Sequence, residues 1–348
     1  MDWSELLPDL LHLISKRLPD LSDFIRFRAV CKRWRSAAPT TDPPPQLPWY
    51  VETTYDNTVR FKSLSTGKSV NITFFEVEWD AYHPGSSNGH ILVSGSNASN
   101  LSLLNPLTRN EIPLPLPPTD SIYHCLIYTG LDPVRSGDDV VLWWFSSEVV
   151  LTVGICRPGD QEWETIQLSG WANGQTYYKG MYYVIEKDNP ATKIMDIRTG
   201  ATLSIIPPPI CASTGKPFPL EYLIVSSEGL LGVSGYNGTH DIRDFKFEVY
   251  RLDDKNKVAR WIKINSIGDR ILFLDNTKGF CLSTNEIEGF KGDCIYFITD
   301  MYEYDNIYNV RCPICRYDLK NRTAEKAVSN SFRNMSHWFF PRTLDQWE

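Results

Sequence analysis

One pentapeptide matches the pattern of a catalytic serine. Residues 85–89 read Gly-Ser-Ser-Asn-Gly, and Gly-x-Ser-x-Gly is the turn that presents the nucleophile in many acyl-transfer enzymes. That turn connects a strand to a helix and works with a later acid and a histidine. Here Pro84 precedes it, and the apolar segment 91–93, typical of a strand, follows it. The sequence therefore predicts an ordinary turn.

Two cysteines have the spacing of half a zinc site. Cys312 and Cys315 are two residues apart, whereas a structural zinc ion needs four ligands. Residues three positions apart point to opposite faces of a regular strand, so both thiols could bind one ion only if Pro313 started a turn. Cys281 and Cys294 stand apart. We expect no metal, no cofactor and no redox chemistry here.

The remaining reactive side chains form no cluster. None of the six histidines belongs to a His-Glu-x-x-His motif, and no glycine pattern of a nucleotide-binding loop occurs. The aromatic pairs at 143–144, 177–178 and 182–183 could stack on a sugar or a base, but aromatic residues of strands usually pack in a core. We therefore predict no catalytic residue and no enzymatic activity, although a propeller enzyme or lectin is an alternative.

The first 38 residues have the periodicity of short helices. Apolar residues recur every three or four positions, as on one helix face, at Leu7, Leu10, Leu11, Ile14 and Leu18. Pro8 suits the first turn of this helix and Pro19 stops it. A second stripe begins at Phe24 and Phe27 and continues through Val30 toward Pro39, so we expect three short helices.

This helical segment is too small to bury all its apolar side chains. Units below about 40 residues rarely hold a core without disulfides, metal or oligomerisation, and Cys31 is the segment's one cysteine. We infer that the missing core comes from another protein.

The order of these residues resembles the F-box. A Leu-Pro pair, a Leu/Ile stripe and Arg-x-Arg-x-Val-Cys-Lys-x-Trp follow one another as in that family. The resemblance implies docking on the Skp-family adaptor, and through it on a cullin, in a ubiquitin ligase. The positions that the family packs against the adaptor correspond to Leu7, Pro8, Leu11, Ile14, Leu18, Val30, Cys31 and Trp34. The alternative is an N-terminal helical cap on the following domain.

Charge separates this segment from the rest of the chain. Residues 1–38 contain seven Lys and Arg against five Asp and Glu, a net charge of +2. Because the whole chain has a net charge of −7, the remaining residues have a net charge of −9. An acidic body argues against nucleic acid, whose phosphates are bound by clustered Lys and Arg. It also argues against an anionic membrane surface. We expect neither as a partner.

Composition is that of an ordinary globular protein. The 348 residues are 42% hydrophobic and 22% charged, and no apolar run approaches 18 residues. Acidic residues precede the first basic one, unlike a signal peptide, and the eight cysteines are scattered as reduced thiols would be. We expect a cytoplasmic and/or nuclear protein.

A proline-rich segment divides the chain. Residues 39–48 contain five prolines, which favours an extended spacer. We therefore predict a helical domain at 1–38, a linker at 39–48 and a second domain at 49–348.

The second domain reads as many short strands. Six segments are rich in β-branched and aromatic residues: 51–54, 91–93, 140–145, 181–185, 223–225 and 294–298. Similar turn clusters recur between them, at 64–68, 105–109, 157–160, 196–200, 252–255 and 318–321. This spacing predicts an all-β domain, a β-propeller of about six (six to seven) four-stranded blades. A β-sandwich is the structural alternative.

This domain also resembles a known one. Segments such as Asn88–Leu92, Leu103–Thr108, Tyr178–Tyr182 and Trp338–Pro341 are similar to the kelch-related domain of unknown function that follows plant F-boxes. The resemblance departs at His90, where that family usually has an aromatic residue. It implies a fold and leaves the substrate open.

Together, these features predict a substrate receptor. The helices would hold the adaptor, and the propeller would hold a protein that becomes ubiquitinated, with catalysis coming from a raised effective concentration. The alternative is an interaction or inhibitory protein that binds the adaptor or a client without promoting degradation.

Overall fold

The computed structural model describes most of the chain. The described residues are 3–18, 21–39, 48–53, 58–64, 69–73, 86–87, 89–94, 100–106, 109–118, 126–129, 140–145, 150–157, 159–169, 172–186, 189–210, 215–237, 241–255, 258–275, 278–285, 287, 290–299, 311–327, 332–333 and 337–339. Most of the predicted linker therefore lies outside the described residues.

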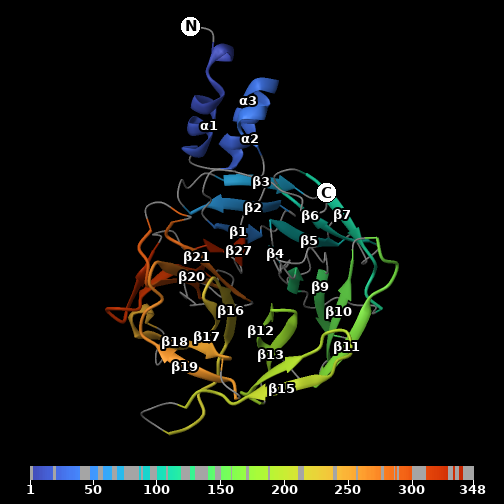
Figure 1. Cartoon of the computed structure of the whole chain (residues 1–348), viewed down its shortest axis with the longest axis vertical. Coiled ribbons are helices and arrows are strands. Elements are labelled where there is room, and N and C mark those ends of the chain that lie inside the picture. The colour runs from blue at the N-terminus through green and yellow to red at the C-terminus, as the bar shows by residue number, and fades with distance from the viewer. Residues whose placement is uncertain are drawn as a thin grey trace.

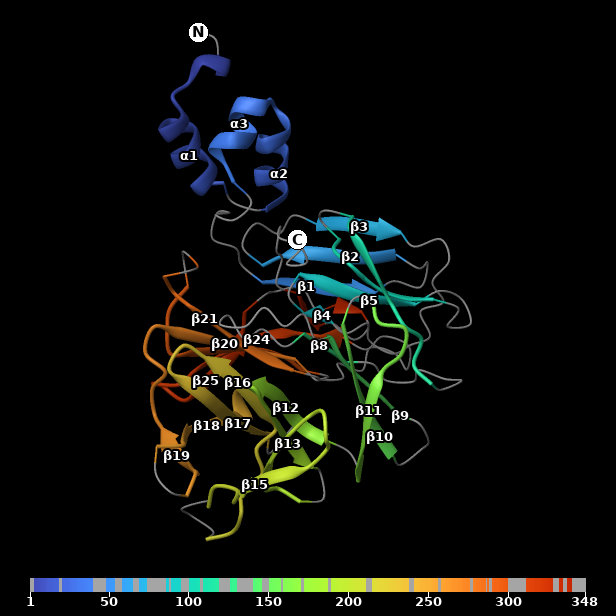
Figure 2. The same ribbon diagram turned by 45° about the vertical axis from the view of Figure 1, so that its right-hand side comes forward.

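The N-terminal part forms short helices, as the apolar spacing predicts. They are the 3-10 turn η1 (Trp3–Glu5) and the α-helices α1 (Pro8–Lys16), α2 (Leu21–Ala29) and α3 (Lys32–Ala37). The three α-helices stand together beyond strand β3, outside the β-rich body (Figure 1 and Figure 2). None of the described helices is long and apolar enough to cross a membrane.

The rest of the described chain is β-strand arranged in small sheets. One sheet has the order β27 (His337–Phe339), β1 (Trp49–Thr53), β2 (Thr58–Ser63) and β3 (Ser69–Thr73). The next consists of β4 (Ser86–Ser87), β5 (His90–Ser94), β6 (Leu101–Leu104) and β7 (Glu111–Leu114). A third sheet consists of β8 (Leu126–Thr129), β9 (Val140–Phe145), β10 (Val150–Cys156) and β11 (Glu164–Ser169). A fourth consists of β12 (Ala172–Tyr178), β13 (Met181–Glu186), β14 (Thr192–Met195) and β15 (Thr202–Ile206).

The C-terminal sheets are less regular. One four-stranded sheet contains β16 (Tyr222–Ser226), β17 (Gly229–Asn237), β18 (Phe245–Asp253) and β19 (Arg260–Ile264). The next has the order β21 (Gly279–Ser283), β20 (Arg270–Leu274), β22 (Cys294–Ile298), β24 (Ile314–Asp318) and β25 (Thr323–Lys326). Its β20 and β22 are parallel, unlike the antiparallel pairs of the other sheets. A short 3-10 turn, η3 (Ile242–Asp244), precedes β18, and β23 (Arg311–Cys312) pairs with β26 (Phe332–Arg333).

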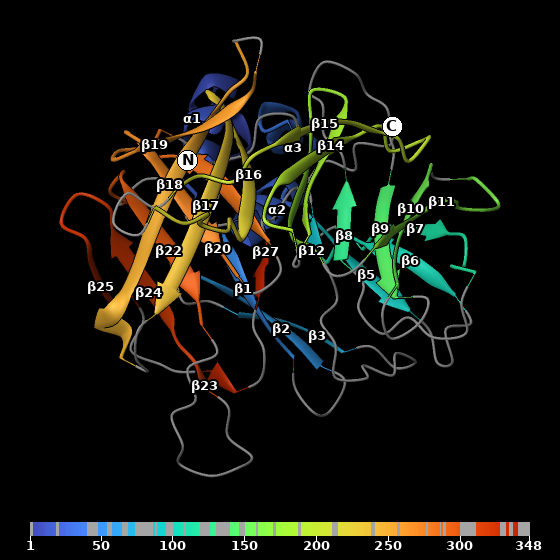
Figure 3. The same cartoon turned by 90° about the horizontal axis from the view of Figure 1, so that it is seen from below.

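The sheets surround a common centre (Figure 1 and Figure 3). One end strand of each faces inward, because β4 contacts both β27 and β8, and β16 contacts both β12 and β21. This arrangement is a β-propeller, so the predicted order of a three-helix unit followed by a β-propeller is confirmed and the β-sandwich alternative is wrong. The described residues of all six predicted strand segments lie in strands, and Thr54 lies outside the described residues.

The recurring turns have one structural position. As far as they are described, they join the last strand but one of a sheet to its outer strand, as between β14 and β15 or between β24 and β25. Asp196 shows why polar residues recur there, because its Oδ1 accepts the backbone N–H groups of Arg198 at 2.9 Å and Thr199 at 3.1 Å. Gly200 follows with φ of +69°. The repeated sequence signal therefore marks one hairpin of each sheet.

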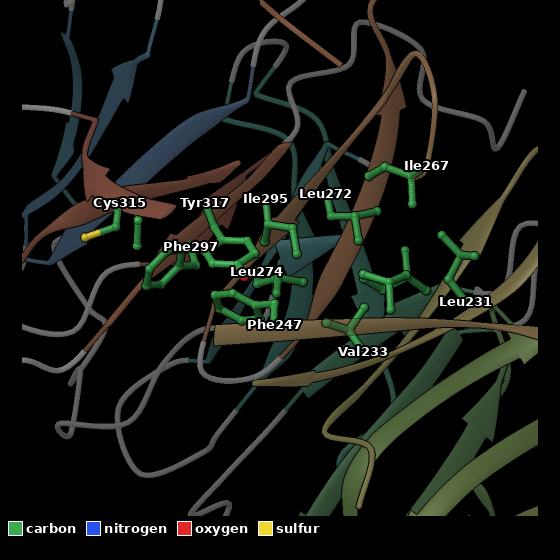
Figure 4. Packing of buried hydrophobic residues seen from close by; sticks show 13 residues of the cluster. Leu231, Val233, Phe247, Ile267, Leu272, Leu274, Ile295, Phe297, Cys315 and Tyr317 are labelled. Carbon is green, nitrogen blue, oxygen red and sulfur yellow. The ribbon is translucent and has the colours of Figure 1, made fainter. Parts of the chain in front are cut away.

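Apolar side chains fill the spaces between neighbouring sheets. The cluster in Figure 4 joins the sheet of β16–β19 to the five-stranded sheet. The ring centroids of Phe247 lie 5.0 Å from Phe297 and 5.3 Å from Tyr317, with edge-to-face geometry. The aromatic pair 182–183 is also buried, as expected for a core. The side chains of 143–144 lie outside the described ones.

The last strand closes the ring. β27 pairs with β1, with Tyr50 opposite Trp338, so the two ends of the β-domain share one sheet. The buried indole of Trp338 donates from Nε1 to the carbonyl of Leu274 at 2.8 Å, and its backbone N–H donates to Asp275 Oδ2 at 3.0 Å. The closing strand is thereby tied to the preceding sheet.

We predict that Trp338→Ala lowers the free energy of unfolding by about 3–5 kcal/mol, because it removes a buried indole and leaves a cavity at this junction. Urea denaturation measures the effect. Trp3→Ala is the matched control, since Trp3 is 67% exposed and its loss should change stability by less than about 0.5 kcal/mol. Equal effects of the two substitutions would contradict the closing role.

Candidate interaction site on the helical unit

Local sequence sets the first helix. Leu7 is extended, with φ of −61° and ψ of 140°, and Pro8 occupies the first helical position, where its missing N–H is not needed. The carbonyl of Leu7 accepts the backbone N–H of Leu11 at 3.1 Å and starts the helix. Asp9 in the first turn and Lys16 in the last turn have the signs that the helix dipole favours.

The three helices share a small core. Its fully or nearly buried members are Leu11, Phe24, Phe27 and Ala38, and Leu6, Leu18, Trp34 and Ala37 pack against them. The ring of Trp34 lies 4.4 Å from that of Phe27, and its Nε1 donates to the carbonyl of Trp3 at 3.2 Å. His12 Nδ1 lies 3.1 Å from the carbonyl of Ala37, which links α1 to the end of α3. The unit therefore has a core, but a minimal one.

The outward side of the unit is apolar. Six large apolar side chains of these 38 residues are 40–67% exposed: Trp3, Leu7, Leu10, Leu13, Ile14 and Val30. Scattered exposed apolar residues are normal, but so many on one small unit are typical of an interaction surface. The β-domain does not cover these side chains. We call these six residues the exposed apolar face.

The eight residues predicted to bind an adaptor fall into three groups. Leu7, Pro8, Ile14 and Val30 are exposed, while Leu18, Cys31 and Trp34 are half-buried. Leu11 is completely buried in the helical core, where it supports the face from behind.

Three further large apolar residues are exposed but lie outside the predicted set of eight. Trp3, Leu10 and Leu13 belong to the exposed apolar face. Leu10 follows Leu7 by three positions and Leu13 follows Leu10 by three, a spacing that keeps side chains on neighbouring parts of one helix surface. This spacing is the sequence signal that indicates Leu10 and Leu13, whereas the F-box resemblance does not include them.

Basic residues accompany this face. Arg17, Lys32, Arg33 and Arg35 are exposed on the same unit, and Arg33 forms an ion pair with Glu5 at 3.3 Å. Arg28 has a different task, because it donates to the carbonyls of Ala38 and Arg35 and so fixes the end of α3. Burial and the nearby Arg35 lower the pKa of Arg28. Positive charge around an apolar centre favours an acidic partner.

The residues that match a catalytic or metal-binding pattern in the sequence lie in strands and turns of the propeller. Ser87 pairs with His90, and Gly89 between them has φ of +80°, so the described residues of the pentapeptide, 86, 87 and 89, belong to a β-hairpin and its turn, as predicted. Gly85 and Asn88 lie outside the described residues. His90 itself is buried at the start of β5. Among the described residues, no group of three or more His, Cys, Asp or Glu could hold a metal ion.

The two closely spaced cysteines lie on separate strands. Cys312 belongs to β23 and Cys315 to β24, and these strands are in different sheets. Cys315 is fully buried in the core, which raises the pKa of its thiol to about 12. A neutral thiol is a poor nucleophile and a poor metal ligand, so this side chain serves packing.

Comparison with known proteins agrees with these features. The profile of the KIB1-4 beta-propeller matches residues 61–320, and that of the F-box domain matches residues 3–42. The chain belongs to the F-box proteins with a KIB1-4 β-propeller. Both resemblances noted in the sequence, to the F-box and to the plant kelch-related domain, are thereby confirmed.

Its relatives include F-box proteins of the plant Arabidopsis thaliana. It is 25% identical to an F-box/kelch-repeat protein of Arabidopsis thaliana over 348 residues, covering 87% of each chain. Another F-box protein of that plant is 25% identical over 97% of this chain and 96% of its own. The F-box protein SKIP23 of Arabidopsis thaliana is 25% identical over 88% of this chain and 86% of its own. This F-box protein is therefore similar to its relatives along nearly their whole length.

We predict that native Cys315 resists alkylation by iodoacetamide at pH 8, because a thiol with a pKa of about 12 is almost entirely protonated there and is buried. The half-buried Cys31 should react with iodoacetamide before Cys315 does. Peptide mass spectrometry after labelling measures both, and labelling in 6 M guanidinium is the control in which both react. Rapid native labelling of Cys315 would contradict its burial.

Proposed function

We propose that this F-box protein is the substrate-recognition subunit of a Skp-cullin-F-box ubiquitin ligase. The single observation that supports this most is the exposed apolar face of the helices, which the β-domain leaves uncovered. Because the F-box profile matches residues 3–42, we propose the Skp-family adaptor as the protein that binds this face. The adaptor in turn would bind a cullin.

We propose that the adaptor contacts the exposed members of the predicted set, Leu7, Pro8, Ile14 and Val30, together with the half-buried Leu18, Cys31 and Trp34. Leu11 acts from the core. Leu10 and Leu13 extend the contact area because they are exposed on the same helix. Interfaces of this kind place apolar residues at the centre and charge at the rim, so the exposed arginines would steer and orient the partner.

The propeller would hold the protein substrate. We propose that it has six blades, which is supported by six sheets of four or five strands within the described residues. It performs no bond chemistry in this proposal and acts by holding a client close to the charged ubiquitin carrier. Such a complex would work in the cytoplasm and/or the nucleus, and neither nucleic acid nor a membrane is among its proposed partners.

A second function is an interaction or inhibitory protein that binds the adaptor or a client without degradation. The same exposed face favours it equally, since the face concerns docking alone. The half-life of captured clients, with and without an intact exposed face, separates these two functions.

We predict that the double variant Leu7→Ala/Ile14→Ala binds a purified Skp-family adaptor at least about 30-fold more weakly, or about 2 kcal/mol, because it removes two apolar contacts from the interface. Isothermal titration calorimetry with the full chain measures the affinity. Both side chains are exposed, so the helical core remains intact.

Val258→Ala is the matched control, because Val258 is 70% exposed but lies in the β-domain. Its affinity should equal that of the wild type. Unchanged affinity of the double variant would contradict the proposed docking site.

A further inference from the structure

One outer strand of the propeller differs from the others. In β15, Leu203 is 53% and Ile205 is 55% exposed, and only the last residue of the strand is buried. β15 ends its sheet, so its outer edge has no strand partner within the described part of the chain. It lies at the periphery of the molecule, at the bottom of Figure 1. Two large aliphatic side chains thus flank a row of main-chain groups at the surface.

Four other outer strands, β7, β11, β19 and β25, are protected against pairing. Native proteins usually place charge or proline on edge strands to prevent association. Such residues are Glu111 and Pro113 in β7, Glu164 in β11, Arg260 and Lys263 in β19, and Glu325 and Lys326 in β25. β15 has the sequence Thr-Leu-Ser-Ile-Ile and lacks both. β3 also lacks both, but Ser69 is its one residue whose side chain is described.

The apolar patch on β15 is bounded by charge. Lys193 of β14 lies opposite Ile205, and its Nζ pairs with Glu186 Oε1 at 2.7 Å. Leu203 lies at the irregularity in the β14–β15 register. The apolar surface is therefore a narrow strip along the edge and does not continue across the sheet.

The area of the strip limits its occupant. Burying a whole aliphatic side chain contributes about 1.5–3 kcal/mol, which at about 25 cal/mol per Å² corresponds to roughly 60–120 Å² of apolar surface. Two half-exposed side chains together therefore offer a partner roughly the same 60–120 Å². A stable interface between folded proteins needs about 800 Å² on each partner. A second copy of this chain is therefore a poor fit. A short extended segment fits better, because main-chain hydrogen bonds along the edge add to so small an apolar contact.

We propose that β15 binds an extended, apolar segment of a partner protein as an added strand. The main-chain edge supplies affinity, while Leu203 and Ile205 select apolar side chains at alternate positions of the segment. This site is distinct from the helical face that docks the adaptor. That the partner is the client rests on the proposed function, whereas strand addition itself does not.

The test uses the full chain and a fluorescein-labelled ten-residue peptide of alternating Val and Thr. Fluorescence anisotropy should show binding to the wild type and at least tenfold weaker binding to Leu203→Lys/Ile205→Lys. Val258→Lys is the matched control, since it adds charge at an exposed apolar residue outside β15 and should bind as the wild type does. No binding to the wild type, or equal binding to the β15 variant, would overturn the proposal.

A second measurement does not depend on the variants. The same peptide with alternate backbone nitrogens methylated keeps its apolar side chains but loses strand hydrogen bonds, so it should fail to bind. Equal binding of the methylated peptide would overturn strand addition. Light scattering should show a monomer for wild type and variant alike, and a wild-type dimer lost in the β15 variant would overturn the peptide proposal in favour of self-association.

Adaptor affinity distinguishes the two proposals. The β15 variant should bind the Skp-family adaptor as the wild type does, and the Leu7→Ala/Ile14→Ala variant should bind the peptide as the wild type does. Each site can therefore fail without the other.

Discussion

The main physical constraint on this protein is that its small helical unit buries only some of its own apolar side chains. Four residues form its buried centre, and six large apolar side chains remain on the outside. Burial of an aliphatic side chain is worth about 1.5–3 kcal/mol, so this exposed face represents a large part of what a unit of this size could gain. The remaining stabilisation becomes available when another protein covers it. In the proposed function, docking of the adaptor would complete this core.

The propeller meets the opposite requirement. It closes on itself, because β27 pairs with β1 and Trp338 ties the closing strand to Leu274 and Asp275 of the neighbouring sheet. Its apolar clusters lie between sheets, so little of its core needs a partner. Each sheet still has one outer edge, and the outer strands β7, β11, β19 and β25 carry charge or proline there. The edge of β15, which lacks such residues, therefore stands out. The chain combines a helical unit with exposed apolar side chains and a propeller that closes on itself.

Sequence periodicity predicted these elements because it reflects local constraints. The spacing from Leu7 to Leu18 and the position of Pro8 predicted α1, and the recurring polar turns predicted the hairpins at the outer strands. Long-range features were less accessible. The parallel pairing of β20 with β22 joins residues brought together by the whole fold, and no local signal encodes it. Leu11 and Leu10 are adjacent in one apolar stripe, yet one is buried and the other exposed, because packing against α2 and α3 decides which side faces inward.

Hydrogen–deuterium exchange of the full chain, with and without a purified Skp-family adaptor, tests the central claim most directly. If the adaptor completes the helical core, amides of residues 8–16 and 30–37 should exchange at least tenfold more slowly in the complex, while those of the propeller keep their rates. Unchanged exchange in the helices, or protection confined to the propeller, would contradict the account.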